Sequence, residues 1–421
     1  MRLLISVICV MVAVSTPGRA APSLEPAISI DALVADVVAT NAERRFYEQE
    51  LAAARSARSA VGRLADPELS VEFGEKRTTN ANGNRFGEGL AYSVAIAQPL
   101  EFNGRIALRR AIADRQIDLA ELGYRQYRAT LAARTRTLAY GLFAASAKAD
   151  AASAATDRIE AVVRVLVQRD LAGPSPLIET RILEAGAITT RRQAEVAEQE
   201  YNTALYELNQ LRGTPFASRI RLITPVTVLA PLPPVDLLVD RAHQQNFEIR
   251  SLQAELEQQG LRVSLARRSR LGSVNVGPFY RSETAGTTDR FAGVRVTVPL
   301  PVWNAQAGEV ATQQARVAQA ESAVFAKARE VDRKVFDAAS IYRERTASLG
   351  RLAPGAQARF AEMAQLAERS YRLGAVTVTV YLDAQRQYLD ATAALLDTRR
   401  DALAARLQLD VLTGAEPGES S

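Results

Sequence analysis

The feature that most constrains the fold is a helical stretch of unusual length, residues 104–171. It contains no proline, and the only glycines after its first residue are Gly123 and Gly141. About 65 residues at 1.5 Å each give a rod of roughly 100 Å. No compact domain can bury such a rod, so it must pack along other helices. Residues 90–98, just before it, alternate between apolar and polar, so we expect a strand to lead into the helix.

The sequence contains two similar halves. Residues 31–41 and 236–246 both run from Asp to Asn, and the two segments are offset by 205 positions. Further equivalent positions follow in the same order, with offsets of 200 to 201: Pro99 and Pro299, Gly173 and Gly374, Gly213 and Gly414. Matches that keep their order and spacing indicate an internal repeat.

This repeat predicts the organisation of the whole chain. The first repeat would cover residues 21–223 and the second 236–414. A proline-rich connection, 224–235, would join the two repeats, and a tail, 415–421, would follow the second.

Each repeat is expected to contain the same elements. A helix begins the repeat, with Asp31 or Asp236 as its N-cap. Two strands follow, separated by a polar loop that contains glycine. A long helix, a glycine-centred turn and another helix complete the repeat, and Pro354-Gly355 should interrupt the long helix of the second one. The predicted strands are about 67–76 and 89–100 in the first repeat, and about 272–281 and 289–300 in the second.

The long helices of the second repeat carry apolar residues at heptad spacing. Val317, Val324, Val331 and Ala338 are seven residues apart, and a leucine series beginning at Leu382 has the same spacing. Heptad spacing is typical of coiled-coil seams.

The strands are apolar on one face and polar on the other. Val294, Val296 and Val298 share one face, whereas Arg295 and Thr297 share the other. About 9–11 residues of this pattern suit a strand that crosses a membrane in a β-barrel. A small soluble sheet that caps a helical stalk is the alternative. Aromatic residues for the interfacial girdles would be Tyr92, Phe102, Tyr280, Phe291 and Trp303.

Four membrane strands cannot close a barrel alone, because single-chain barrels begin at about eight strands. An open edge in lipid leaves backbone groups unsatisfied. Several copies must therefore share one barrel wall. The predicted fold is mainly α-helical with a membrane β-barrel part, in which the barrel continues as a helical tunnel.

The N-terminus and composition exclude several classes of protein. Arg2, an apolar run, and small residues up to Ala20 predict a signal peptide, 1–20, that is too short to span a membrane. The only cysteine, Cys9, lies within it, which excludes disulfides and thiolate metal sites from the mature chain. With a single histidine, His243, and no phosphate-binding glycine motif, we expect neither an enzyme nor a cofactor or metal site. Nothing in the sequence indicates a nucleic-acid partner.

Two turn motifs, "RDLAGPSPLIETRI" from residue 169 and "YRLGAVTVTVYLDAQ" from residue 371, complete the pattern. With the strand pairs and the two repeats, the sequence resembles the TolC family of outer-membrane efflux proteins. The segments "QPLEFNGRIALRR" and "VPLPVWNAQAGEV" are most similar to its heavy-metal branch, typified by CzcC. The resemblance implies a homotrimer, with a twelve-stranded barrel in the lipid of the outer membrane and a twelve-helix tunnel in the periplasm of a Gram-negative bacterium. It also implies a passive duct that works with a periplasmic adaptor protein and an inner-membrane pump of the resistance-nodulation-division (RND) class.

The resemblance further implies a gate at the periplasmic tip. Tyr371 and Glu179 would be hydrogen-bonded there, and Asp383 would face the constriction. The second gate aspartate and the gate arginine of the family are replaced by Val380 and Val376, which at least halves the acidic constriction.

The glycines Gly173 and Gly374 would form the tip turns and contact the adaptor. The residues themselves also allow simpler interpretations. Asp383 could be a solvated helix residue, and Glu179 could serve only the dipole of the helix that it begins.

Two other functions remain open at this stage. The same channel could be the exit duct of a type I protein secretion system, since only the partners would differ. A periplasmic coiled-coil adaptor without a pore belongs to another class, but such proteins usually carry one helical hairpin and lack paired membrane-length strands. The exported substrate does not follow from the sequence, and heavy-metal cations rest on the branch similarity alone.

Overall fold

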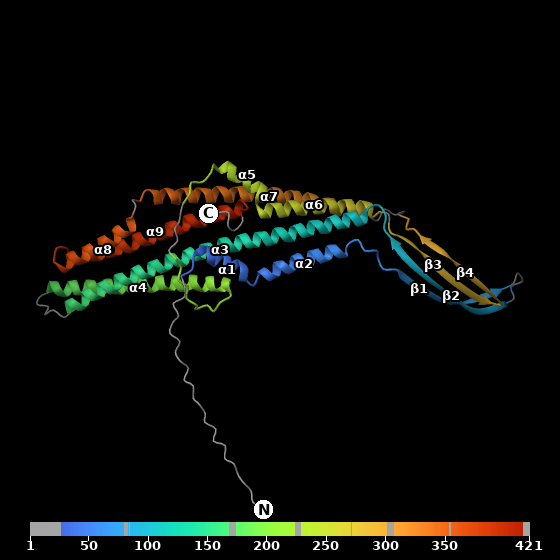
Figure 1. Cartoon of the computed structure of the whole chain (residues 1–421), viewed down its shortest axis with the longest axis horizontal. Helices are drawn as coiled ribbons and strands as arrows, with labels where there is room; N and C mark the ends of the chain where they lie inside the picture. Colours follow the sequence, from blue (N-terminus) through green and yellow to red (C-terminus); the bar gives the residue numbers. More distant parts are fainter. Residues whose placement is uncertain are drawn as a thin grey trace, which may run out of the picture.

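A computed structural model shows a long rod of helices with a β-sheet at one end (Figure 1). The predictions for the signal peptide, Gly173, Pro354, Trp303 and most of the tail lie outside the described residues. The structure describes residues 27–79, 83, 85–167, 174–223, 229–270, 272–300, 307–352 and 355–415.

The central helix of the rod is α3 (Arg105–Val167), which has 63 residues and no interruption. This corresponds to about 95 Å at 1.5 Å per residue. Its counterpart in the second repeat is divided into α7 (Ala307–Gly350) and α8 (Ala356–Arg372). Gly355 has a left-handed φ of 74° and immediately precedes α8, so the predicted break at this position is present.

The helices form four columns along the rod. On one side of α3 lie α2 (Arg44–Ala60) near the sheet and α4 (Pro174–Arg212) toward the far tip (Figure 1). On the other side α3 contacts α6 (Phe247–Arg268) and α9 (Val378–Leu412). Helices α6 and α9 both also contact α7, and α9 contacts α8. The order of columns is therefore α2 with α4, α3, α6 with α9, and α7 with α8.

Two short helices begin the repeats. Ser29 caps α1 (Ile30–Thr40), since its hydroxyl accepts a hydrogen bond from the Ala32 backbone N–H at 3.2 Å. Helix α5 (Val235–Gln245) follows Pro234. The predicted N-caps are wrong, because Asp31 and Asp236 lie inside the first turn of these helices. An acidic side chain there still stabilises the helix through its interaction with the helix dipole.

The four strands form one antiparallel sheet in the order β1-β2-β3-β4, so β2 and β3 join the two repeats. Every strand differs by some residues from its predicted bounds. Part of the predicted loop between the last two strands is itself paired, and the turn lies at Gly286, which has a φ of 80°. The β3–β4 hydrogen-bonded ladder continues through polar residues beyond the apolar stretch. Because these residues are polar, the sequence predicted a loop there. The strands are β1 (Glu68–Thr79), β2 (Arg85–Leu100), β3 (Val274–Ala285) and β4 (Thr287–Thr297).

The register assigns the apolar side chains of all four strands to one face, because paired residues point to the same side of a sheet. Val71 pairs with Val94, and Val276 pairs with Val296. These apolar side chains are largely exposed in the single chain, and Phe73 reaches 76% exposure. The sheet thus presents an apolar surface to its surroundings on one side.

The opposite face is polar and carries ion pairs. Lys76 on β1 reaches Glu283 on β3 at 2.8 Å and Asp289 on β4 at 3.2 Å. It passes over β2 at Gly89, the residue paired with Lys76, where no side chain is in the way. Phe291 pairs with Arg281 on this polar face, so its predicted place in an outer aromatic girdle is wrong.

Two of the predicted girdle residues do lie on the apolar face. Tyr92 pairs with Phe73 and Tyr280 pairs with Val94, so both rings lie on the apolar face. Their centroids are 6.3 Å apart.

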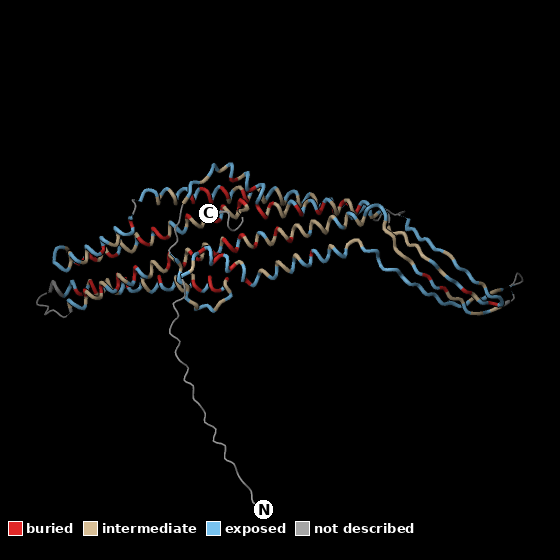
Figure 2. Tube along the Cα trace, in the orientation of Figure 1, coloured by how far each residue is buried: buried red, intermediate tan, exposed pale blue. Residues whose placement is uncertain are grey.

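The buried residues follow the seams between helices, whereas strand residues are mostly exposed or half-buried (Figure 2). One core cluster joins α1, α3 and α4, and another joins α5, α6, α7 and α9. Of the predicted heptad residues, Val331 and Ala338 are buried, whereas Val317 and Val324 are only half-buried in one chain. No helix within the described ranges is both long enough and apolar enough to span a membrane.

Candidate functional site at the helical tip

The far end of the rod is built around a glycine turn between α8 and α9. Gly374 has a φ of 74°, and its N–H donates to the Tyr371 carbonyl at 2.9 Å. The Ala375 N–H donates to the Ser370 carbonyl at 2.8 Å. This pair of bonds is a Schellman motif, which requires the left-handed conformation that glycine adopts without strain. The predicted turn at Gly374 is therefore present, whereas Gly173 lies outside the described residues.

A tyrosine pair fixes the base of this turn. The ring of Tyr371, at the end of α8, stacks on Tyr381 of α9 with centroids 5.3 Å apart and planes 8° from parallel. Tyr381 is fully buried against Ile159 and Val162 of α3 and Leu183 of α4. Its hydroxyl has no hydrogen-bond partner in the described part of the chain, and burial raises the pKa of Tyr381. Sequence reasoning missed this residue, because only the packing of α3 and α4 shows that it is buried.

A cavity of about 840 Å³ adjoins the turn. Glu179 of α4 and Tyr371, which were predicted to be hydrogen-bonded, both line it, as do Gly374 and the two residues that replace family gate residues, Val376 and Val380. The structure thus brings together three of the predicted site residues. Glu179 is exposed, and the cavity wall combines apolar residues such as Val162 with the polar residues Arg372 and Thr377.

Asp383 lies apart from this cavity. It is exposed on α9, and the Gln387 side chain donates to it at 2.6 Å. Tyr381 and Gln385 of the same helix are buried toward α3 and α8, so the side of α9 that carries Asp383 points away from this packing. Two turns further, Asp390 is also exposed, and it lies 3.7 Å from Arg386.

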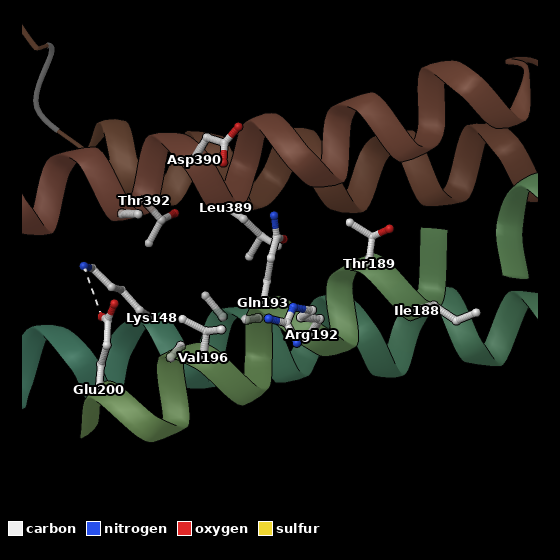
Figure 3. Close-up of a pocket in the computed structure, with 14 residues that line it drawn as sticks. Lys148, Ile188, Thr189, Arg192, Gln193, Val196, Glu200, Leu389, Asp390 and Thr392 are labelled. Atoms are coloured by element: carbon white, nitrogen blue, oxygen red, sulfur yellow. Dashed lines mark ion pairs between the residues drawn. The ribbon is translucent and has the colours of Figure 1, made fainter. Parts of the chain in front are cut away.

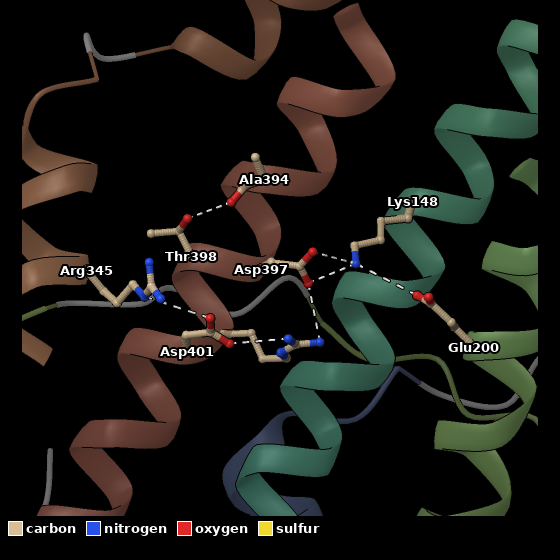
Figure 4. Close-up of polar contacts among 8 residues, drawn as sticks. Lys148, Glu200, Arg345, Ala394, Asp397, Thr398 and Asp401 are labelled. Atoms are coloured by element: carbon tan, nitrogen blue, oxygen red, sulfur yellow. Dashed lines mark hydrogen bonds and ion pairs between the residues drawn. The ribbon is translucent and has the colours of Figure 1, made fainter. Parts of the chain in front are cut away.

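Further from the tip along the rod, a network of charged side chains connects three helix columns (Figure 4). Lys148 of α3 donates to both carboxylate oxygens of Asp397 on α9, at 2.8 and 2.9 Å. It also lies 3.8 Å from Glu200 on α4. The Lys148 side chain is only 15% exposed, so the ion pair joins the two repeats within the packing. This residue was not recognised in the sequence, where lysine spacing carries no signal for a partner about 250 residues away.

The network continues along α9 to the last column. Arg400 lies 3.3 Å from Asp397 and 3.2 Å from Asp401, and Arg345 of α7 lies 3.9 Å from Asp401. All four columns are thereby linked by charge at one level of the rod.

Next to this network, a groove of about 580 Å³ runs between α3, α4 and α9 (Figure 3). Lys148 and Glu200 lie at one end of it, and Ile188 lies at the other. The small residues Ala151 and Ala152 of α3 also line it.

Among the described residues there is no group of three His, Cys, Asp or Glu side chains that could hold a metal ion. The single histidine, His243 of α5, lies 2.5 Å from Asp332 of α7 and is partly exposed.

The described residues thus form an antiparallel sheet with one apolar face, continued by a helical rod that has a glycine turn at Gly374. Residues 238–415 match the family model "Outer membrane efflux protein", which covers most of the second repeat. No curated protein sequence matches the chain significantly.

Solved structures of channels share this fold along nearly the whole chain. CusC, described as forming a transmembrane channel, is 17% identical, with a TM-score of 0.69 and 92% of each chain covered. The CmeC outer membrane channel of Campylobacter jejuni is 15% identical, with a TM-score of 0.70, 93% of this chain and 87% of that chain covered. The open state of the MtrE outer membrane channel of Neisseria gonorrhoeae is 16% identical, with a TM-score of 0.65, 93% of this chain and 91% of that chain covered.

These comparisons confirm the predicted TolC-like fold. They also support the predicted resemblance to the outer membrane efflux protein family. The identities are low, so the likeness to these structures concerns the fold.

Proposed function

We propose that this protein is the outer-membrane channel of a tripartite efflux system. It would be a passive exit duct, with its sheet in the outer membrane and its helices in the periplasm. Substrates would pass through it after an inner-membrane pump has moved them, so no bond-breaking chemistry is required. The match to the efflux-protein family model and the fold shared with outer membrane channels support this proposal.

The observation that carries the proposal is the pair of free sheet edges. In the described residues, β1 and β4 each pair on one side only, and the sheet between them has an exposed apolar face. Unpaired backbone groups in lipid cost several kcal/mol each, so such edges must be paired with other copies. Three copies would place β4 of one chain beside β1 of the next and close a twelve-stranded barrel.

The same symmetry would place four helix columns from each chain into a twelve-column tunnel. The column of α7 and α8 would then face the α2 and α4 column of the next copy. The exposed apolar side chain of Phe325 on α7 fits this arrangement. A pore-free periplasmic adaptor would expose the apolar face and the two free edges of the sheet to water, so the sheet argues against this class of protein.

We assign the gate to the tip. Glu179 and Tyr371 would lock α4 to α8 across their shared cavity, and Asp383 of each copy would form an acidic ring in the constriction. The tip turns at Gly173 and Gly374 would contact a periplasmic adaptor, which would connect the channel to an RND pump. Heavy-metal cations are the proposed substrates, and the similarity of two sequence segments to the CzcC-like branch supports them.

The test of the channel is direct. The full chain, purified in mild detergent, should run as a heat-modifiable trimer and should conduct ions in planar bilayers. A monomer that is soluble without detergent would contradict the proposal. For the gate, Tyr371→Phe and Glu179→Gln should each raise the open probability, and the double variant should raise it no further. Additive effects would show that the two residues act separately.

A further inference from the structure

The positive charge of the chain is concentrated where the strands meet the helices. The whole sequence carries 52 basic and 47 acidic residues. Three segments at this junction, 61–68, 101–110 and 261–270, contain eight of the arginines and three of the carboxylates. Without the predicted signal peptide, which carries Arg2 and Arg19, the chain has 50 basic and 47 acidic residues, so the remainder outside these segments has a net charge of −2.

Contacts hold these three segments together in space. The Gln98 side chain donates to the Ala65 carbonyl at 2.7 Å, and Arg110 of α3 donates to the Gly62 carbonyl at 3.4 Å. Arg268, at the end of α6, donates to the Asn103 carbonyl at 3.0 Å. The junction therefore forms one continuous surface contributed by both repeats.

Most of the arginines on this surface are not neutralised. Glu101 already pairs with Arg105 and Arg109. Five other arginines are exposed, and none of the five makes an ion pair within the described ranges of the chain. We call these five the arginine collar: Arg63, Arg110, Arg267, Arg268 and Arg270.

The collar adjoins the apolar face of the sheet. Exposed apolar side chains also lie at the junction, since Leu64 is 65% exposed, Phe102 53% and Leu300 77%. An apolar band bordered by arginines matches the boundary of a bilayer, where side chains of this kind extend their charged groups to the headgroups. The guanidinium group also fits phosphate oxygens with two parallel hydrogen bonds.

We propose that the arginine collar binds the phosphate headgroups of anionic phospholipids in the membrane leaflet nearest the helices. This inference rests on the proposed function, because it needs the sheet to lie in a membrane. In the proposed orientation this is the inner leaflet of the outer membrane. The lipid contact fixes the depth of the barrel and the position of the helical tunnel below it.

The test compares two triple variants of the full chain. The collar variant is Arg63→Gln, Arg267→Gln and Arg270→Gln, three residues whose side chains make no hydrogen bond or ion pair with the described part of the chain. The control variant is Arg45→Gln, Arg241→Gln and Arg359→Gln, which removes the same charge from exposed positions on α2, α5 and α8. Both proteins are purified in nonionic detergent, and only heat-modifiable oligomers are assayed. Phosphatidylglycerol or phosphatidylcholine is added, and native mass spectrometry measures the bound lipid.

The wild type and the control should bind phosphatidylglycerol in preference to phosphatidylcholine. The collar variant should bind phosphatidylglycerol at least about tenfold more weakly. It lacks three arginines, and each arginine near an anionic headgroup strengthens binding several-fold. Inorganic phosphate at millimolar concentration should not displace the lipid.

Three results would overturn the proposal: unchanged lipid binding in the collar variant, an equal loss in the control, or displacement by inorganic phosphate alone. A collar variant that alters the charge selectivity of the pore but binds lipid normally would place the arginines in the lumen instead, and this too refutes the lipid site. Failure to form oligomers or to conduct ions in the wild type would refute the proposed channel instead.

Discussion

Asn41 and Asn246 occupy the same position in the two repeats and make the same long-range hydrogen bond. The Nδ2 of Asn41 donates to the Leu211 carbonyl at the end of α4, and the Nδ2 of Asn246 donates to the Leu412 carbonyl at the end of α9. Both side chains are buried. Each repeat is therefore closed by an asparagine that ties its first helices to the end of its last helix.

Replacing either asparagine should destabilise its own repeat. Asn246→Leu removes the bond to Leu412 and also the cap that Asn246 provides for α6, since its Oδ1 accepts from the Glu248 and Ile249 backbone N–H groups. With buried backbone groups left unsatisfied, the expected loss is about 2–4 kcal/mol. Asn246→Ser keeps a capping oxygen and should lose less. Thermal unfolding in detergent would measure the order, and equal losses would argue against the capping role.

The buried hydroxyl of Tyr381 should lower the free energy of unfolding of the tip. It has no hydrogen-bond partner in the part of the chain that the structure describes, although the ring packs fully. Tyr381→Phe keeps the stack on Tyr371 and should stabilise the fold by about 1 kcal/mol or leave it unchanged. Tyr381→Ala should cost about 3–5 kcal/mol through the cavity that it creates. A clear loss of thermal stability in Tyr381→Phe would show that the hydroxyl has a partner, such as an ordered water.

The Lys148–Asp397 pair should couple the two repeats. A double-mutant cycle with Lys148→Met and Asp397→Asn should give a coupling energy of about 1–2 kcal/mol, because Lys148 is mostly buried while Asp397 is 36% exposed. As a matched control, the exposed pair Arg333 and Asp337 on α7 should give about 0.3–0.5 kcal/mol. A coupling at Lys148 no larger than at Arg333 would mean that this network does not hold α3 to α9.

The general architecture was accessible from sequence because its signals are local. The length of α3 and the alternation in β4 can be seen within single segments, and both predict their element without knowledge of neighbours. The face of Phe291 was wrongly predicted, although alternation along β4 already places it on the side of Arg295 and Thr297, and its pairing with Arg281 shows the same side.

The tip shows the same division between local and long-range information. The turn at Gly374 follows from one motif, and its Schellman geometry agrees with the prediction. The burial of Tyr381 depends on α3 and α4, and the partner of Lys148 lies in the other repeat. Such contacts require the order of the helix columns, which no single segment encodes.

Asp410, near the end of α9, should make stability depend on pH. Burial raises the pKa of its carboxyl, while Arg406, which is 3.2 Å away, and Arg136 lower it. A carboxyl whose folded pKa exceeds its unfolded pKa favours folding when protonated. Its contribution is fully present below the ordinary pKa of 3.8 and is lost as the pH rises through the higher folded value.

Asp410→Asn should therefore raise the thermal unfolding midpoint at pH 7, and the gain should shrink as the pH approaches 4. A lower midpoint for Asp410→Asn at pH 7 would show that the ion pair with Arg406 outweighs the cost of burial.

The acidic gate predicts a block of the pore by cations. If Asp383 of each copy faces the constriction, divalent or trivalent cations added on the tip side should bind the carboxylate ring and reduce single-channel current. Asp383→Ala should weaken this block at least about tenfold, since it removes the carboxylate of every copy, and the loss of even one charge that a multivalent cation contacts at short range costs more than about 1.4 kcal/mol. Current recordings in planar bilayers, with cation titrated on one side, would measure the inhibition constant.

Asp390 is the matched control for this experiment. It lies seven residues further along α9, about 10 Å from Asp383 along the helix axis, and it is also exposed. Because Arg386 already lies 3.7 Å from it, Asp390→Ala should change the block little. A block that survives in Asp383→Ala but disappears in Asp390→Ala would move the constriction two turns up the tunnel, and a block unaffected by either would exclude an acidic gate on this face of α9.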